Sequence, residues 1–562
     1  MSDYMNRYHE WLESDAVDEA TKEELRSIAG DEKEIEERFY RNLEFGTGGL
    51  RGIMAAGTNR MNVYTVRRAT QGLMNYLLKM DPKAAEKGIA IAYDSRHNSD
   101  VFARETAAVA NGNGVKAYVF ESLRPTPMLS FAIRELGCKS GVVVTASHNP
   151  SVYNGYKAYW DDGCQVPPPM DAEIIDEVDA VDMFEGVKTM PREEAEKAGL
   201  YIEIGKEIDD KFNARALELI INKEAVAKYG ADLKIVYTPM HGAGLKPVTR
   251  ALTEAGFTNL HVVPSQAQPD GSFPTASYPN PEMRNCFDKA VELGTEIDAD
   301  ILIATDPDAD RMAIMVKKDG EYKQFTGNMT GCLLLSYILE AKKQAGTLPA
   351  DGFIVKTIVS SEMPRAIAAD YGVDLHECLT GFKYIGQQIL RSEQTGVGTY
   401  LFGYEESIGY LCNTYCRDKD SVSAALLISE MAAVYKAKGL TLVDVLEGLY
   451  KKYGYYQETQ VALTFEGIEG TAKIKKLMDD LRANPAESYA GLKVLEIKDY
   501  SQGIEGMPKS NVLRFMLEKN CWFCARPSGT EPKIKFYFGV KGETLDEAKA
   551  MLEDLKSAVT PK

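Results

Sequence analysis

Residues Val142–Lys157 read VVVTASHNPSVYNGYK and contain the transition that decides the fold. Three consecutive valines suit a buried strand, and this strand stops at Ser147 and His148, just before Pro150. Apolar strands and helical patterns alternate on both sides of the segment, which indicates an α/β domain with a largely parallel sheet. Ligands bind off the carboxyl ends of the strands in such sheets, so the polar residues at this strand end are candidate site residues.

The same alternation of strand and helix patterns extends over most of the chain in three units. The clearest strands are GIAIAYD (88–94), VKAYVF (115–120), LKIVYTP (233–239), DILIATD (300–306), FIVKTIV (353–359) and GTYLFGYEES (398–407). Residues 454–562 show mostly strand patterns, which suggest a mixed sheet with helices on one face in an α+β domain.

The predicted fold class is therefore three similar mixed-sheet α/β domains followed by a C-terminal α+β domain. The predicted domains span residues 1–205, which include short N-terminal helices, and residues 206–322, 323–453 and 454–562. Linkers are expected near 193–206, 318–326 and 453–459. Each of the three similar domains could offer one strand-end loop to a shared cleft, which the fourth domain would close.

The composition limits the kinds of partner. The 562 residues include 65 lysines and arginines against 83 aspartates and glutamates, a net charge of −18. This charge repels nucleic acid and anionic lipid, so neither is an expected partner. The nine cysteines show no disulfide framework, and CWFC (521–524) has the residue pattern of a strand. This use of cysteine is typical of a reduced cytoplasmic protein. The polar N-terminus is unlike a signal peptide and no apolar run reaches about 18 residues, so no membrane span is expected.

Three alternating carboxylates follow the strand of the second unit. Asp306, Asp308 and Asp310 repel one another unless a cation joins them, and oxygen ligands favour Mg²⁺ or Ca²⁺. The glycine and the glutamate that complete a calcium-binding EF-hand loop are missing. A solvated acidic turn is the alternative, but the strand-end position favours a Mg²⁺ site with positions left open for a phosphate.

Ser147 and Lys157 each allow two interpretations. A serine after a strand is commonly a helix N-cap, but the rigid turn at Pro150 is not a helix start. Near a metal ion, the Ser147 hydroxyl could instead carry a phosphoryl group. Lys157 could be solvated, or it could act as a general base if burial or other cations lower its pKa.

Two further loops carry groups that suit a sugar phosphate. GYEES (403–407) places carboxylates and a hydroxyl after an apolar strand, where they could bind vicinal sugar hydroxyls or form an ordinary acidic loop. RPSGTEPKIK (526–535) combines an arginine, hydroxyls and a glycine in a turn between two strands. This combination is typical of a phosphate-binding nest, although a structural hairpin would also explain the glycine and prolines.

These loops, in their order along the chain, resemble the four signature loops of the α-D-phosphohexomutase family, the phosphoglucomutases and phosphomannomutases: TASHNP (145–150), DPDADR (306–311), GYEES and RPSGTEPKIK. EFGTGGLRG (44–52) and the chain length look most like the long branch that also includes phosphopentomutases. The resemblance implies a heart-shaped molecule with a central cleft. It implies interconversion of glucose 1-phosphate and glucose 6-phosphate through phosphoserine and glucose 1,6-bisphosphate, with Mg²⁺ as cofactor.

The resemblance also implies roles for individual residues. Ser147 would be the phosphoserine, beside Mg²⁺ bound by Asp306, Asp308 and Asp310. The other catalytic residues would be Arg51 and Arg311 at the phosphoryl group, Lys157 and His148 in proton transfer, and Lys383. The substrate-binding residues would be Glu405 and Ser407 at the sugar and Arg526, Ser528, Gly529 and Thr530 at the second phosphate.

Several alternatives remain open on the sequence alone. The aromatic Tyr404 departs from the family's sugar loop, so mannose or pentose phosphates could replace glucose phosphates. A metal-dependent phosphatase would release free phosphate, but the six histidines show no ligand spacing for a second metal. A non-catalytic binder would keep the fold without turnover. The expected partner is a small phosphosugar, and the protein is expected to be a monomer or a homodimer.

Overall fold

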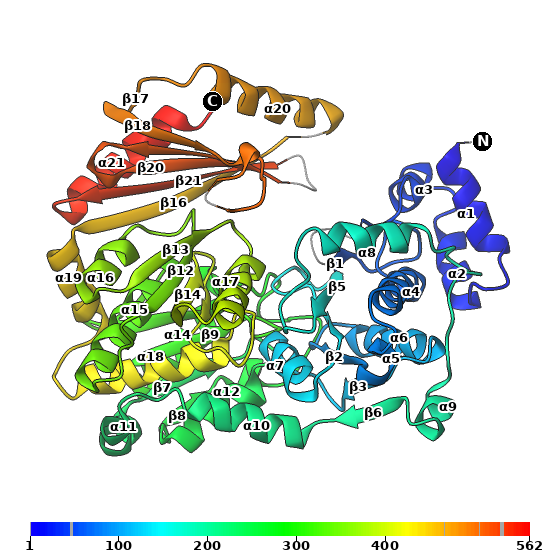
Figure 1. Ribbon diagram of the computed structural model, residues 1–562, viewed down its shortest axis with the longest axis horizontal. Helices are drawn as coiled ribbons and strands as arrows, with labels where there is room; N and C mark the ends of the chain where they lie inside the picture. The colour runs from blue at the N-terminus through cyan, green and yellow to red at the C-terminus, as the bar shows by residue number, and fades with distance from the viewer. Residues whose placement is uncertain (1, 45–48, 466, 505, 529–532, 562) are drawn as a thin grey trace.

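The computed structural model describes residues 2–44, 49–465, 467–504, 506–528 and 533–561, and its strands form four sheets in chain order (Figure 1). Three short helices precede the first sheet: α1 (Asp3–Glu13), α2 (Glu19–Ser27) and α3 (Glu32–Phe39). Their apolar residues form a small core around Trp11 and Phe39, which Ala56 and Tyr64 complete. No helix in these ranges is long and apolar enough to cross a membrane.

The first sheet has the strand order β1-β5-β4-β2-β3-β6. Its strands are β1 (Gly49–Ile53), β2 (Ile89–Tyr93), β3 (Ala117–Phe120), β4 (Ser140–Val144), β5 (Tyr153–Trp160) and β6 (Tyr201–Ile204). The helices of this unit are α4 (Val63–Met80), α5 (Ala84–Lys87), α6 (Ser99–Gly112), α7 (Thr126–Leu136), α8 (Met170–Asp179) and α9 (Arg192–Lys197). Alternate residues of β2 belong to two different cores, so this strand is buried on both faces, as in other α/β sheets.

The second and third sheets are smaller. The second, ordered β11-β10-β9-β7-β8, contains β7 (Ile235–Thr238), β8 (Leu260–Val262), β9 (Ile301–Thr305), β10 (Met312–Lys318) and β11 (Glu321–Gln324). Its helices are α10 (Lys206–Leu217), α11 (Lys223–Tyr229), α12 (Leu245–Ala255), α13 (Pro264–Ala267) and α14 (Asp288–Ile297). The third, ordered β13-β12-β14-β15, contains β12 (Gly352–Thr357), β13 (Asp374–Cys378), β14 (Thr399–Glu405) and β15 (Gly409–Leu411). Its helices are α15 (Gly327–Gln344), α16 (Met363–Tyr371), α17 (Phe382–Thr395), α18 (Ser421–Lys436) and α19 (Leu442–Tyr453).

These three sheets share a local topology that positions the site. In each one, a parallel strand enters a loop and the chain returns in an antiparallel strand beside it: β4 to β5, β9 to β10, and β14 to β15. The loops between these pairs carry Ser147, the three aspartates, and Glu406 and Ser407 of the GYEES segment. The fold class predicted from the sequence is therefore confirmed, and the returning strands explain why each sheet is mixed.

The fourth sheet differs from the prediction in one respect. Its strands are β16 (Tyr455–Thr464), β17 (Ser488–Tyr489), β18 (Leu492–Asp499), β19 (Leu513–Leu517), β20 (Trp522–Pro527) and β21 (Lys533–Gly542). All neighbouring pairs among them are antiparallel, so the sheet is not mixed. The helices α20 (Gly467–Ala483) and α21 (Leu545–Val559) cover it on one side in Figure 1, as an α+β domain requires.

Ordered elements occupy much of the stretches expected as linkers. Residues 193–206 contain most of α9 and all of β6, and residues 318–326 contain β11. β16 begins only two residues after the last residue of α19, and it runs without interruption through 455–464. Its alternating half-buried and exposed residues mark an edge strand, whose polar positions resemble a linker in sequence.

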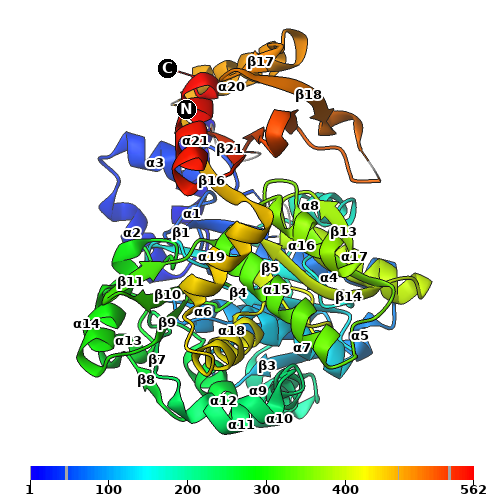
Figure 2. The same cartoon turned by 90° about the vertical axis from the view of Figure 1, so that its left-hand side faces the viewer.

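The first three units share a continuous hydrophobic core, while the fourth has a separate one. Figure 2 shows the fourth unit at the top of the molecule. A smaller cluster joins the third and fourth units, and it includes Ile358, Leu379, Trp522 and Tyr537. The continuous core fixes the loops of the first three units relative to one another.

Candidate active site

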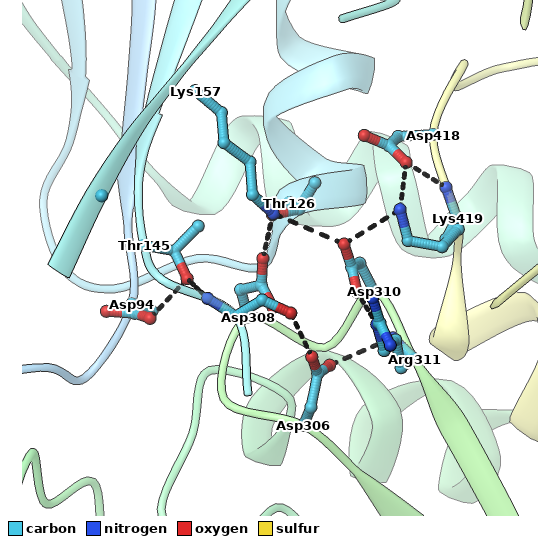
Figure 3. A network of polar contacts seen from close by, with 12 residues as sticks. Asp94, Thr126, Thr145, Lys157, Asp306, Asp308, Asp310, Arg311, Asp418 and Lys419 are labelled. Carbon is cyan, nitrogen blue, oxygen red and sulfur yellow. Dashed lines mark hydrogen bonds and ion pairs between the residues drawn. The ribbon is translucent and has the colours of Figure 1, made fainter. Parts of the chain in front are cut away.

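The loop after β4 meets the loop after β9 at the junction of the first two units (Figure 3). The Ser147 hydroxyl donates a hydrogen bond of 2.8 Å to Asp306 Oδ2, although the two residues are 159 positions apart. Ser147 is 3% exposed and Asp306 is fully buried. The two strand-end residues singled out by the sequence are therefore in direct contact.

The three aspartates form a compact and buried group. Asp306, Asp308 and Asp310 each offer an oxygen within 4.8 Å of the other two. Burial and the charges of Asp308 and Asp310 raise the pKa of Asp306 well above its ordinary value. Asp308 Oδ1 and Asp310 Oδ1 are buried without a hydrogen-bond partner in the described part of the chain. A hard cation would satisfy these oxygens and relieve the repulsion, so the group fits Mg²⁺.

Positive side chains surround the aspartates. Lys157 Nζ lies 2.8 Å from Asp308 Oδ2 and 3.5 Å from Asp310 Oδ2. Lys419 Nζ lies 3.2 Å from Asp310 Oδ2. Arg311 donates its backbone N–H to Asp306 Oδ1 at 3.1 Å, and its guanidinium Nε lies 3.7 Å from Asp310 Oδ1. These cations come from three units, so the site exists only in the assembled fold.

Lys157 does not meet the condition under which it would be a base. Burial would lower the pKa of Lys157, but the carboxylates of Asp308 and Asp310 outweigh burial and raise it above its ordinary value. The register of β4 and β5 pairs Lys157 with Val143, and the side chain reaches the aspartates from the neighbouring strand. The condition for a general base is thus not met, and the two carboxylates hold Lys157 as an ammonium group.

His148 lies next to the serine hydroxyl. Its Nδ1 is 3.1 Å from Ser147 Oγ, and its ring packs edge-on against Tyr278. The single hydroxyl proton goes to Asp306, so His148 Nδ1–H is the donor in this contact. Burial and the charges of Arg311 and Arg51 lower the pKa of His148 well below its ordinary value, which keeps the ring neutral. Arg51, on β1, interacts electrostatically with Arg311 and with the aspartates.

The GYEES residues span the end of β14 and the turn after it, since Gly403–Glu405 are the last residues of the strand. Glu405 is 6% exposed and accepts a hydrogen bond of 2.8 Å from the backbone N–H of Gly381. Its charge acts on Arg311 and on Lys419, so it lies close to the aspartate group. Ser407 lies in the turn between β14 and β15. This loop is also tied to the strand that follows the aspartate loop, since the N–H of Met312, at the start of β10, donates to Ile408 O at 3.0 Å.

The expected phosphate clamp lies at the end of β20. Arg526 is half-buried there, and Ser528 N–H donates to Lys533 O at 2.7 Å across the turn. Burial and the charge of Arg526 lower the pKa of Lys535, which the negative charge of Glu406 partly opposes. These interactions bring the turn of the fourth unit close to the GYEES loop of the third. Gly529 and Thr530 lie outside the described residues.

Lys383 occupies a different position from the other expected catalytic residues. It is 6% exposed on α17, where its ammonium lies 3.2 Å from Asp171 Oδ2 of α8. None of its contacts in the described chain reaches the aspartates, so Lys383 lies at the boundary between the first and third units.

Sequence reasoning missed four members of the network. Lys419 follows β15, and Asp418 Oδ1 holds its ammonium at 2.9 Å. Asp418 in turn accepts a hydrogen bond of 2.6 Å from the Tyr159 hydroxyl of β5. Thr126, at the start of α7, donates to Asp308 Oδ2 at 2.8 Å. The charged run RDKD (417–420) could not be identified by the strand-end rule that drew attention to Ser147, because β15 before it has only three residues and shows no periodic pattern.

Comparisons with known proteins agree with this geometry. Family models described as phosphoglucomutase/phosphomannomutase alpha/beta/alpha domains I, II and III match residues 42–184, 210–320 and 326–453. A "Probable phosphoribomutase" of Schizosaccharomyces pombe is 35% identical over 98% of this chain and 96% of its own length. A "Probable phosphomannomutase" of Haemophilus influenzae is 38% identical over 89% and 97%. A "Phosphoglucomutase" of Staphylococcus haemolyticus is 34% identical over 91% and 93%.

Solved structures share the fold. A structure of a putative phosphomannomutase from Thermus thermophilus has a TM-score of 0.69 at 20% identity, and covers 92% of this chain and 99% of its own. The open form of pp63/parafusin, a phosphoglucomutase from Paramecium, has a TM-score of 0.69 at 18% identity and covers 92% and 95%.

Proposed function

Because the chain belongs to the phosphoglucomutase/phosphomannomutase family, whose members are phosphosugar mutases, we propose that it interconverts α-D-glucose 1-phosphate and glucose 6-phosphate. The observation that carries the proposal is the contact of Ser147 Oγ with Asp306, at 2.8 Å, inside a group of three buried carboxylates. A hydroxyl in this position is suited to hold a phosphoryl group beside a divalent cation.

Asp306, Asp308 and Asp310 are the residues that would hold Mg²⁺, together with a phosphate oxygen on Ser147. When bound, Mg²⁺ would neutralise the charge that spreads over the phosphoryl oxygens during transfer. Arg311 and Arg51 supply further positive charge around the same group. Localisation of this reaction in the cytoplasm is part of the proposal and rests on the reduced cysteines, all nine of which are free and buried.

The proposed reaction has two half-reactions in opposite directions. Phosphorylated Ser147 gives its phosphoryl group to the free hydroxyl of glucose 1-phosphate: the Ser147 O–P bond breaks and the sugar O–P bond forms, while the sugar hydroxyl loses a proton and the serine oxygen gains one, so no net proton is released. The resulting glucose 1,6-bisphosphate then reverses its orientation in the site and returns its other phosphoryl group to Ser147. Lys157 is held protonated by Asp308 and Asp310, so it is suited to protonate the departing serine oxygen.

Because the bisphosphate intermediate must reverse its orientation between the two half-reactions, the pocket has to accept either of its phosphates. Glu405 and Ser407 are proposed to bind sugar hydroxyls, and Arg526 and Ser528, with Gly529 and Thr530, to hold the phosphate that is not transferred. The closeness of the Arg526 turn to the GYEES loop supports a single pocket made by the third and fourth units. Lys419, which lies 3.2 Å from Asp310, is proposed as a further active-site lysine.

A phosphopentomutase is the second candidate, because the relative named "Probable phosphoribomutase" matches 98% of this chain. The chemistry at Ser147 would be the same and only the sugar would change. A panel of glucose, mannose, ribose and deoxyribose 1-phosphates, each with a trace of bisphosphate and ranked by kcat/KM, tests the choice. Glucose 1-phosphate is expected to rank first; a higher kcat/KM for ribose 1-phosphate would favour the second candidate. Release of free phosphate without sugar 6-phosphate would point to a phosphatase instead.

A further inference from the structure

We propose that Arg96 and Asp94, in the loop after β2, are positioning residues that hold the backbone of Ser147 in the geometry for phosphoryl transfer. The proposal rests on the role of Ser147 proposed above and adds two residues to it. Arg96 is 3% exposed and Asp94 is 2% exposed, so both residues are buried from solvent.

The Arg96 guanidinium donates hydrogen bonds to the backbone carbonyls of the serine loop. Its Nη2 donates to Ser147 O at 2.6 Å and to Asn149 O at 2.5 Å. Its Nη1 donates to Pro150 O at 2.9 Å and to Tyr153 O at 3.0 Å. Four carbonyls of one loop therefore converge on a single guanidinium group. A lysine, whose ammonium has three donors and no rigid fork, could not reproduce this pattern.

Asp94 is connected to the backbone N–H of Ser147, whereas Arg96 holds the backbone carbonyl of Ser147. One carboxylate oxygen accepts hydrogen bonds from the backbone N–H of Arg96 at 2.9 Å and from the Ser99 hydroxyl at 2.8 Å. The other accepts from the Thr145 hydroxyl at 2.6 Å, a contact visible in Figure 3. The Thr145 oxygen in turn accepts the backbone N–H of Ser147 at 2.8 Å. Both the amide and the carbonyl of Ser147 are thus connected to Asp94, through Thr145 and Arg96.

Such support is needed because Ser147 has an unfavourable backbone conformation. Its φ angle is 51°, in the left-handed region that residues with a Cβ rarely adopt. In this conformation the hydroxyl reaches Asp306 at 2.8 Å. A residue held in a sparsely populated conformation persists only when its surroundings over-determine it, and such residues cluster at active sites.

The pair also lies against the unit that carries the aspartates. The Arg96 guanidinium is 5.0 Å from the centre of the Phe273 ring, which belongs to the second unit. Next to it, a Cβ on Gly271 would come within 2.4 Å of His97 N, so these two loops are in close contact. His97 Nε2 also lies 2.9 Å from Ser272 Oγ. The same loop therefore fixes Ser147 and packs on the metal-binding unit.

The test compares Arg96→Lys and Asp94→Asn with Arg68→Lys. Arg68 is a matched control, because it is a buried arginine of the same unit that donates to the carbonyls of Val181 and Asp179. Both test variants are expected to lower kcat about 100-fold with KM nearly unchanged, since misplacing a reacting group by about 1 Å has this effect. The control is expected to keep kcat close to that of the wild type. Millimolar guanidinium is expected to restore part of the kcat lost in Arg96→Ala.

Transfer of labelled phosphate from glucose 1,6-bisphosphate to Ser147 separates the possible failures. If the wild type is not labelled at Ser147, the proposed function fails. If the wild type is labelled and Arg96→Lys is labelled at the same rate, only the positioning role is overturned. The positioning role would also be overturned if Arg96→Lys lost no more kcat than the control Arg68→Lys. Should Arg96→Lys not fold, Asp94→Asn, which keeps the size of the side chain, decides by the same criteria.

Discussion

Replacing Arg514 by methionine is expected to loosen the fourth unit from the third. Arg514, on β19, lies 2.5 Å from Glu362 Oε1 and 2.9 Å from Glu377 Oε1, and its side chain is 1% exposed. Lys356 and Arg365 of the third unit contact the same two carboxylates. The cluster therefore has three cations, of which Arg365 is half exposed, and two buried anions, and Arg514 is the cation that the fourth unit contributes.

Removing one partner from a buried ion pair costs about 3–5 kcal/mol, because the other charge stays buried. We expect the lower end, about 3 kcal/mol, since Lys356 and Arg365 still pair with both carboxylates. With a urea dependence of about 1.5 kcal/mol per M, the unfolding midpoint of the fourth unit should fall by about 2 M.

Tryptophan fluorescence can report this unit alone. The protein has three tryptophans, and Arg514 lies 4.9 Å from the ring of Trp522 in the fourth unit. Urea unfolding would be followed in a background that carries Trp11→Phe and Trp160→Phe. Arg482→Met is the matched control: its ion pair with Asp499, at 3.0 Å, is partly exposed and should contribute less than about 1 kcal/mol. Equal midpoints for the Arg514 and Arg482 variants would refute the reasoning.

Three other predictions follow from the same contacts. Asp308→Asn should remove activation by Mg²⁺ together with most of kcat, as measured by a Mg²⁺ titration of turnover; a variant that Mg²⁺ still activates would place the metal elsewhere. Arg526→Ala should raise KM for the sugar phosphate about tenfold or more with a smaller change in kcat, because the clamp binds phosphate in ground and transition states alike; an unchanged KM would exclude the clamp. Burial would raise the pKa of Glu362, but the charges of Lys356 and Arg514 lower it from 4.5 to about 2. Its contribution to stability is therefore complete above pH 4.5 and is lost as the pH falls through about 2. Acid unfolding followed at Trp522 tests this, and a stability that does not change across that window would contradict it.

The positions of the loops could be predicted from the sequence because strand ends are local features. The apolar runs before Ser147 and Asp306 identify buried strands, and parallel sheets direct such ends to one side. The three-residue strand β15 has too few positions for a periodic pattern, so the returning strand after GYEES could not be recognised.

Contacts between distant segments could not be predicted in the same way. Lys419 reaches Asp310 across 109 positions only because the third unit packs on the second. The raised pKa of Lys157 likewise depends on two aspartates of another unit, which the sequence alone does not place beside it. Arg96 follows a strand end as Ser147 does, but its four carbonyl partners depend on how the serine loop folds over it.

The most direct measurement of the central claim is the site of phosphate transfer. The protein would be incubated with labelled glucose 1,6-bisphosphate, with and without Mg²⁺, and the labelled peptide identified. The account predicts one labelled residue, Ser147, that depends on Mg²⁺ and is unlabelled in Ser147→Ala, a variant that should also lose nearly all turnover. Label on another residue, or full mutase activity of Ser147→Ala, would contradict the account.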